Sequence, residues 1–127
     1  MALLLDTHVF FWWITGSDKL SNAHRQLIAA KNETVLISAV TGWELALKVK
    51  IGKWPDAAAL LPDLESSIKA EGFEILDLTL DQAKLAGSLE LVHRDPFDRL
   101  LAAQAISRGI PIATVDPALK LLGATIV

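Results

Sequence analysis

The sequence contains no cysteine at any of its 127 positions. Disulfide bonds, cysteine-ligated zinc and thiol catalysis are therefore excluded, and the composition fits a reducing cytosol. The longest apolar run, VFFWWI over residues 9–14, is far shorter than the roughly 20 residues that a membrane-spanning helix needs. The N-terminal MALLLD has no basic stretch ahead of its apolar residues, so we expect no signal peptide, no membrane partner and a cytoplasmic protein.

An excess of positive charge is also lacking, since the formal net charge is −3. A chain that binds nucleic acid through a general basic field has the opposite sign, so any polyanion would have to meet local lysines and arginines or bound cations. The hydrophobic fraction of 52% and the charged fraction of 21% place the chain among globular proteins and outside the disordered class. A length of 127 residues predicts one domain spanning residues 1–127.

Short apolar runs alternate with helical segments along the whole chain. The runs predict strands at ALLLD, TVLIS, FEILDL, IPIATV and ATIV, which are residues 2–6, 34–38, 73–78, 110–115 and 124–127. The segments between them predict helices, several of which end at a glycine and one of which is interrupted near Pro62. Strands that are apolar throughout are buried on both faces, as in a parallel sheet covered by helices. We therefore predict the α/β class, with a central parallel sheet of four to five strands flanked by helices in three α/β/α layers.

Acidic residues stand where the predicted strands end. Asp6 ends the first strand, and Asp116 follows the fourth. Asp95 and Asp98 begin the next-to-last predicted helix. Ligands of open parallel sheets bind at this carboxyl edge. Each aspartate taken alone also fits a helix cap, and Asp-Pro is a common way to begin a helix, so the aspartates by themselves do not separate a binding site from a set of caps.

Glu44 lies on the apolar face of the helix predicted after the second strand. Its spacing matches that of four apolar neighbours on one helix face, namely Val40, Trp43, Leu47 and Ile51. An ionised carboxylate on a core face is costly unless it is paired or bound to a cation. An ion pair with Lys48, four residues on, is the alternative explanation. We favour a bound cation, because Asp98 has the same inward register and several acids converge on one end of the sheet.

The residue types at this edge indicate which cation would bind. Clustered carboxylates raise one another's pKa unless a cation neutralises them. A set of oxygen ligands without cysteine suits a hard cation such as Mg²⁺ or Mn²⁺. Such a cation activates water and stabilises an in-line displacement at phosphorus. It also attracts phosphate to a pocket that would otherwise repel it.

Four motifs stand in a fixed order along the chain: LLLDTH at residues 3–8, ISAVTGWEL at 37–45, HRDPFDRLLAAQA at 93–105 and IATVD at 112–116. Together they resemble the PIN-domain family, specifically the VapC-type toxins of toxin–antitoxin pairs. The resemblance extends over Ala2 to Val127 and implies a PIN-like fold, a parallel sheet with flanking helices. It also implies a metal-dependent endoribonuclease that hydrolyses RNA phosphodiester bonds with water as the nucleophile and Mg²⁺ or Mn²⁺ as the cofactor.

The resemblance assigns the metal site residue by residue. The implied ligands, which are also the implied catalytic residues, are Asp6, Glu44, Asp98 and Asp116. Asp95 is the second choice for the third position, since its register favours a cap whereas that of Asp98 faces inward. The residues implied to orient the carboxylates or the attacking water are Thr7, Ser38 and Thr114. Asp116 departs from many relatives in being followed directly by a proline, which strengthens a capping role.

Basic and aromatic residues beside the acidic motifs suggest where partners bind. Arg94, Arg99 and Lys48 are candidate contacts for RNA phosphates, and the alternative of a solvated helix end is stronger for the lysine than for the arginines. Four consecutive aromatics, FFWW at residues 10–13, cannot all point inward from a helix, so we expect some at the surface or at an interface. The resemblance implies a small cognate antitoxin and a homodimer or toxin–antitoxin hetero-oligomer, and it favours such an interface over base stacking.

Two other classes of function stay open on the sequence alone. A receiver-like phosphoacceptor domain also uses an acidic Mg²⁺ pocket, and Asp77 in the third strand stands where its phosphoacceptor would be. That class also needs a lysine after the last strand, and none follows the strand predicted to end at Val127, so we rank it low. A catalytically silent PIN-fold binding module is the other class, and the presence of all four acids argues against it.

Overall fold

The structure is a computed structural model that describes residues 2–90 and 95–127. Its strands are β1 (Ala2–Leu5), β2 (Thr34–Ser38), β3 (Glu74–Leu76) and β4 (Ile112–Ala113). Its helices are α1 (Thr7–Thr15), α2 (Asn22–Ala29), α3 (Ala39–Lys50), the 3-10 helix η1 (Pro55–Leu60), α4 (Leu64–Ala70), α5 (Leu80–Ser88), α6 (Pro96–Arg108) and α7 (Ala118–Leu121). Arg94, one of the candidate RNA contacts, lies outside the described residues.

The described strands form one parallel sheet in the order β3-β2-β1-β4. Leu4 of the central strand β1 lies opposite Leu36 on one side and Ile112 on the other. The predicted parallel sheet is therefore confirmed, with four strands. The segment predicted as the last strand contributes only an isolated bridge between Ile112 and Ile126. The outer strands are shorter than predicted, at three residues for β3 and two for β4, because a strand at the sheet's edge has few partners to extend it.

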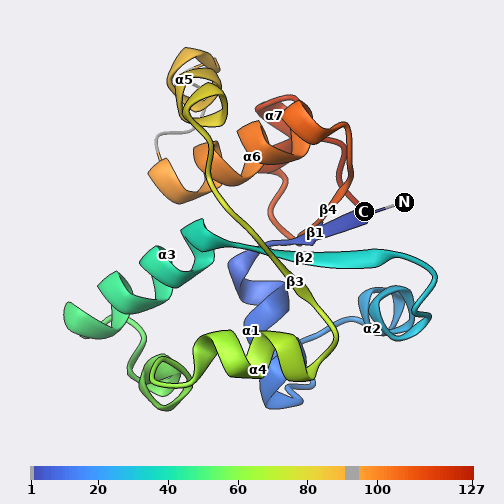
Figure 1. Cartoon of the computed structure of the whole chain (residues 1–127), viewed down its shortest axis with the longest axis vertical. Coiled ribbons are helices and arrows are strands. Elements are labelled where there is room, and N and C mark those ends of the chain that lie inside the picture. The colour runs from blue at the N-terminus through green and yellow to red at the C-terminus, as the bar shows by residue number, and fades with distance from the viewer. Residues whose placement is uncertain (1, 91–94) are drawn as a thin grey trace.

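Helices cover both faces of the sheet, which gives the predicted three-layer α/β/α arrangement (Figure 1). α5, α6 and α7 lie on one face, and α1, α2 and α4 lie on the other. The two faces of β1 contribute to separate cores, because successive side chains of a strand point to opposite sides. Leu3 and Leu5 belong to the same cluster as Phe10 of α1, whereas Leu4 belongs to that of Leu101 of α6. Burial on both faces explains why no polar alternation marks the strand.

The polar residues that end the strands also begin the helices. Asp6 is the N-cap of α1 and accepts a hydrogen bond from the Val9 N–H at 2.8 Å. Ser38 caps α3 through the Val40 N–H, and Asp95 caps α6. Because Asp6 directly follows β1 and Ser38 is the last residue of β2, the first turns of α1 and α3 lie at the carboxyl edge of the sheet. Polar side chains in those turns are thereby placed where ligands of such sheets bind.

The aromatic helix α1 is enclosed on more sides than its sequence suggests. Phe10 is fully buried, while Phe11, Trp12 and Trp13 are half-buried against the core. Trp13 Nε1 donates to the Glu71 carboxylate at 2.6 Å. Three of the four rings therefore keep part of their surface accessible, as predicted, although the segments that precede η1 and follow α4 pack against the helix. The interface expected for these rings stays a prediction.

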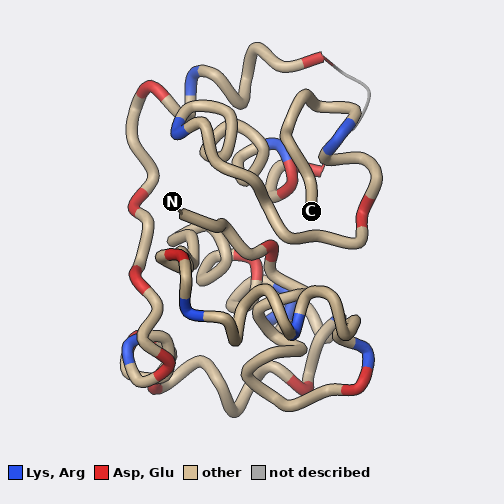
Figure 2. The backbone as a smooth tube through the Cα atoms, turned by 90° about the vertical axis from the view of Figure 1, so that its right-hand side faces the viewer, with Lys and Arg blue, Asp and Glu red and all other residues tan. Residues whose placement is uncertain are grey.

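Charged residues are spread along the chain without a face of one sign. In the view of Figure 2, acidic and basic positions are interspersed and neither colour covers a whole side of the tube. Attraction of a polyanion, where it occurs, is therefore a property of local groups of residues.

None of the helices in the described part of the chain has the length and apolar character needed to cross a membrane.

Candidate active site at the carboxyl edge of the sheet

A pocket of about 400 Å³ lies where β1, α3, α6 and the loop after β4 meet. All five acids singled out in the sequence line it, namely Asp6, Glu44, Asp95, Asp98 and Asp116. These residues come from four segments that are far apart in the sequence. The prediction that they converge at one end of the sheet is therefore fulfilled, and we call this cavity the acidic pocket.

Asp6 is a buried carboxylate of the acidic pocket, and both of its oxygens are held by hydrogen bonds. It is 6% exposed, and its two oxygens accept hydrogen bonds from the Val9 N–H at 2.8 Å and from the Thr114 hydroxyl at 2.5 Å. Burial raises the pKa of its carboxyl group, and the nearby charge of Glu44 adds to this, whereas the two hydrogen bonds and His8 oppose it. An anion that is poorly solvated in this way gains free energy from a nearby cation.

Thr114 connects Asp6 to Asp116 across the end of the sheet. Its hydroxyl donates to Asp6 and accepts from the Asp116 N–H at 3.0 Å. The Asp116 carboxylate in turn accepts from the Ala118 N–H at 2.9 Å at the start of α7. The orienting role predicted for Thr114 and the capping role predicted for Asp116 both agree with these contacts.

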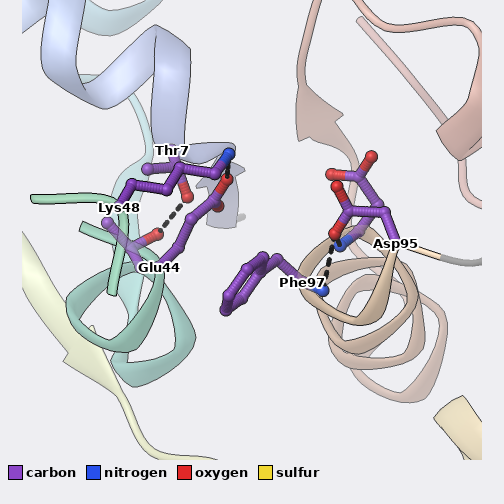
Figure 3. A network of polar contacts seen from close by, with 7 residues as sticks. Thr7, Glu44, Lys48, Asp95 and Phe97 are labelled. Carbon is purple, nitrogen blue, oxygen red and sulfur yellow. Dashed lines mark hydrogen bonds and ion pairs between the residues drawn. The ribbon is translucent and has the colours of Figure 1, made fainter. Parts of the chain in front are cut away.

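Glu44 is buried in an ion pair with Lys48 on the same helix. The glutamate is 3% exposed, and its Oε2 lies 2.5 Å from the lysine Nζ. Figure 3 shows this pair on one side of the site and Asp95 on the other, with the Phe97 ring pointing into the space between them. The ion pair that we considered the weaker explanation is thus present, because the two side chains are four residues apart on one helix face.

The apolar face predicted around Glu44 is only partly buried. Val40 and Glu44 are buried, but the remaining members are exposed, at 49% for Trp43, 38% for Leu47 and 54% for Ile51. Helical spacing alone did not reveal this division, because α3 extends away from the end of β2 (Figure 1).

Asp95 and Asp98 both line the acidic pocket, but they are used differently. The Asp95 carboxylate accepts from the N–H groups of Phe97 at 2.8 Å and Asp98 at 3.3 Å, which is the cap geometry expected from its register. Asp98 lies in the first turn of α6, where its own N–H is one of the two groups that Asp95 caps. The choice of Asp98 over Asp95 as a ligand therefore stays a prediction that is compatible with the cap.

Thr7 and Ser38 do not contact the carboxylates that they were predicted to orient. The Thr7 hydroxyl lies 3.1 Å from that of Thr41, and the Ser38 hydroxyl donates to Gln104 Oε1 at 2.5 Å. These buried contacts join α1 to α3 and α3 to α6, so they position the helices that carry Glu44 and Asp98. Our reading of the sequence missed the two partners, although Gln104 interrupts the inward apolar register of α6 and Thr41 lies one turn before Glu44.

Arg99 has a structural role that replaces its predicted contact with RNA. Its side chain is 9% exposed, and its guanidinium donates to the backbone carbonyls of Ala86 at 2.6 Å, Leu89 at 2.8 Å and Glu90 at 2.9 Å. These carbonyls belong to the end of α5 and the residues after it. The guanidinium therefore joins the C-terminus of α5 to α6, where helix carbonyls need donors.

The chemistry of the acidic pocket fits a hard divalent cation, although the side chains are not arranged around one. Among the described residues, no three His, Cys, Asp or Glu side chains lie close enough to hold a metal ion together. The available donors are carboxylate oxygens, the ligands that Mg²⁺ and Mn²⁺ prefer. In this arrangement the ammonium of Lys48 supplies the positive charge beside Glu44.

Replacing Lys48 with methionine is expected to lower the free energy of unfolding of the metal-free protein by about 1–3 kcal/mol, because Glu44 stays buried without its ammonium partner. The loss is smaller than for a fully buried pair because the lysine side chain is 23% exposed. The matched control is Lys69→Met, which breaks an exposed pair of the same spacing with Glu65 and should change stability by less than about 0.5 kcal/mol. Equal losses in urea unfolding of the two variants would contradict this account of Glu44.

The fold and the site together define an α/β/α domain with several carboxylates in one pocket at the carboxyl edge of a parallel sheet. A model of the PIN domain matches residues 3–124, and the chain belongs to the PIN-domain family. The resemblance read from the four sequence motifs is thereby confirmed. The chain is 32% identical over 120 residues to Ribonuclease VapC22 of Mycobacterium tuberculosis, in an alignment that covers 94% of this chain and 90% of that protein.

Solved structures share the same fold. The match to VapBC2 from Rickettsia felis, solved bound to a DNA fragment from its promoter, has a TM-score of 0.72 and 19% identity and covers 100% of this chain and 98% of that one. The match to FitAcB from Neisseria gonorrhoeae has a TM-score of 0.71 and 22% identity and covers 98% and 95%. At these identities the two matches support the fold.

Asp77 does not join the carboxylates of the acidic pocket. It is exposed at the end of β3, and its backbone carbonyl accepts a hydrogen bond from Gln104 Nε2 at 3.3 Å. A receiver-like domain needs its phosphoacceptor within the acidic pocket, where Asp77 is not found. The receiver-like alternative therefore loses the residue that suggested it.

Proposed function

We propose that this protein is an endoribonuclease that depends on Mg²⁺ or Mn²⁺, that it hydrolyses RNA phosphodiester bonds, and that it acts as the toxin of a toxin–antitoxin pair. The observation that carries the proposal is the convergence of acids from four segments on one pocket of a PIN-domain chain. The 32% identity to a mycobacterial ribonuclease supports the same reaction class.

The proposed metal ligands are Asp6, Glu44, Asp98 and Asp116, with Asp95 as the second choice for the place of Asp98. When bound, the cation supplies Lewis-acid stabilisation of charge at phosphorus and favours ionisation of water. The chain itself supplies orientation, because Thr114 holds the Asp6 carboxylate and the N–H groups of Val9 and Ala118 hold Asp6 and Asp116. The ammonium of Lys48, which lines the same pocket, is placed to attract a phosphate.

The proposed partners are an RNA substrate and a small cognate antitoxin, with a homodimer or a toxin–antitoxin hetero-oligomer as the assembly. The fold shared with VapBC2 and FitAcB supports this proposal. Co-expression with the product of a neighbouring small gene, followed by size-exclusion chromatography with light scattering, measures the assembly directly. Elution of the two products as separate species would argue against the antitoxin.

The test of the proposed activity is cleavage of a mixed RNA pool by the purified protein with Mg²⁺, with Mn²⁺ and with EDTA. We expect cleavage with the metal ions, none with EDTA, and a loss of at least about 100-fold for Glu44→Gln, which keeps the size of the side chain but weakens a metal ligand. Glu65→Gln is the matched control, since Glu65 also pairs with a lysine four residues on but is exposed on α4. Cleavage that persists in EDTA, or that survives Glu44→Gln, would refute the proposal.

Binding of Mg²⁺ or Mn²⁺ without cleavage of any RNA would favour the alternative of a catalytically silent binding module. Isothermal titration calorimetry on the same preparations separates that outcome from a misfolded sample, because a correctly folded protein still binds the metal. The Glu44→Gln variant should then lose metal binding as well.

A further inference from the structure

A second cavity adjoins the acidic pocket and has a different character. Its volume is about 610 Å³, and it lies between α1, the end of α3 and the segment that leads into η1. His8, Trp12 and Lys48 line both cavities and therefore form the boundary between them. Any ligand that fills the second cavity can continue into the acidic pocket without leaving the protein surface.

The floor of this second cavity is a group of stacked rings. His8 stacks on Trp54 with ring centroids 4.7 Å apart and planes 20° from parallel, and Trp12 lies 5.8 Å from His8 in a tilted arrangement. Trp54 is half-buried and also packs against Phe11, whereas His8 is exposed. The rings therefore form a supported platform whose outer member is open to a flat ligand.

The charges around the platform are mainly positive. Lys19, Lys48 and Lys53 line the cavity, and Asp56 is the acid among its lining residues. Lys48 Nζ lies 5.9 Å from the Trp54 ring centroid, so positive charge and aromatic surface occur side by side. The acidic pocket has the opposite balance, with five carboxylates and Lys48. The local charge thus changes from mainly positive in the second cavity to mainly negative in the acidic pocket, and His8, Trp12 and Lys48 mark the boundary.

Aromatic faces beside lysines match the two parts of a nucleotide. Nucleic-acid bases stack on aromatic side chains, and phosphates bind lysines. A base inside a duplex has both faces covered by its neighbours and cannot reach such a platform, whereas an unpaired base can. We propose that the second cavity binds an unpaired RNA nucleotide next to the phosphodiester bond in the acidic pocket, with its base on the His8–Trp54 platform and its phosphates at Lys53 and Lys19.

This inference rests on the proposed function in one respect, namely that the phosphodiester bond in the acidic pocket is the one that is cleaved. Its test therefore measures RNA binding under conditions in which no cleavage occurs. The probe is a short fluorescein-labelled RNA of mixed sequence in EDTA, presented single-stranded and annealed to its complement. We expect the single strand to bind at least about tenfold more tightly than the duplex. Equal affinity for the two forms would overturn the proposal.

Lysine variants distinguish RNA binding in the second cavity from attraction of RNA by the net charge of the protein. Lys53→Met should weaken single-strand binding about threefold or more at low salt and reduce the slope of log affinity against log salt by about 0.7. Lys50→Met is the matched control, because Lys50 is exposed at the end of α3, three residues before Lys53, but lines neither cavity. Equal effects of the two variants would show that only net charge matters and would overturn the proposal.

Aromatic variants test the platform. His8→Ala removes an exposed ring and should weaken single-strand binding about fivefold or more in a variant that still unfolds cooperatively, and Trp54→Leu should reduce the quenching of tryptophan fluorescence by the bound RNA, with Trp12 as the remaining tryptophan of the cavity. A competition experiment adds inorganic polyphosphate or polyglutamate to the bound RNA at equal total charge. Displacement of the RNA by either polymer would indicate a site for any polyanion or for an acidic protein partner, and would overturn the nucleotide assignment.

The outcomes distinguish this inference from the proposed nuclease activity. Cleavage in Mg²⁺ combined with unchanged KM in Lys53→Met and His8→Ala would overturn the nucleotide site and leave the activity intact. Binding in EDTA with the expected losses, but no cleavage with any metal ion, would support the nucleotide site and refute the activity.

Discussion

Replacing Asp6 with asparagine is expected to raise the thermal stability of the metal-free protein and at the same time to abolish RNA cleavage. Asp6 is 6% exposed, and burial raises the pKa of its carboxyl group, so above that raised pKa an ionised carboxylate destabilises the native state. Asparagine keeps an oxygen that accepts the Val9 N–H bond and removes the charge. It also removes a proposed metal ligand, so cleavage should fall by at least about 100-fold.

The pH dependence of this stability gain has a defined sign. Between the ordinary and the raised pKa, the folded state binds more protons at Asp6 than the unfolded state, so the contribution of Asp6 to stability falls as the pH rises through that window. Below the ordinary aspartate pKa of about 3.9, the carboxyl group is protonated in both states and the penalty vanishes. The advantage of Asp6→Asn should therefore be small in acid, grow through the window and stay constant at pH values above it.

Thermal unfolding of the wild type and Asp6→Asn, each with EDTA and with Mg²⁺ or Mn²⁺, measures both effects. The metal should raise the Tm of the wild type, because it binds only the folded state, and should leave that of the variant unchanged. Asp18→Asn is the control, since Asp18 is exposed and outside the acidic pocket. A variant less stable than the wild type at neutral pH would contradict the sign derived from burial, and a variant with full activity would refute Asp6 as a ligand.

Replacing Arg99 with methionine is expected to lower the free energy of unfolding by at least about 3 kcal/mol, the largest stability loss that we predict for a single substitution. The guanidinium donates to carbonyls at 2.6, 2.8 and 2.9 Å from the end of α5 and the residues that follow it. Hydrogen bonds to a charged group are worth more than neutral ones, and the change leaves one buried and two partly buried acceptors without this donor. Methionine fills the volume of the side chain stem but supplies no donor.

Urea unfolding measures this loss, with Arg108→Met as the control at the exposed end of the same helix. The control should cost less than about 1 kcal/mol, the size of a helix-terminus charge effect. The folded fraction of Arg99→Met should bind single-stranded RNA with an unchanged salt slope, because the guanidinium does not contact phosphate. A slope reduced by about 0.7 with unaltered stability would restore the RNA contact predicted from the sequence.

The parallel sheet and the positions of the acids were predictable because the signals that determine them are local. Apolar runs without polar alternation indicate strands buried on both faces, and β1 and β2 appear where such runs predicted them. Asp6 and Asp95 are helix caps, as their registers indicated, and they also line the acidic pocket. One residue can serve both purposes, because the cap of a helix that follows a strand lies at the sheet's carboxyl edge.

The partners of individual side chains were less predictable, because they depend on which helices pack together. Glu44 was expected to face a cation and is paired with Lys48. Ser38 was expected to orient a carboxylate or the attacking water, and the hydrogen bond that it donates goes to Gln104, a residue 66 positions away. Arg99, expected on the surface, is buried against the end of α5. None of these contacts follows from the spacing of one helix.

The sequence by itself determined the α/β class, the caps and the delivery of five acids to one edge of the sheet, because strand burial, capping and chain direction are properties of short segments. Only the tertiary structure decided that Lys48 neutralises Glu44, that three of the aromatics of α1 are half-buried against neighbouring segments and that a lysine-lined cavity with a ring platform adjoins the acidic pocket. Those features arise where α1, α3 and the segment before η1 meet, and their relative placement is set by packing between segments distant in sequence.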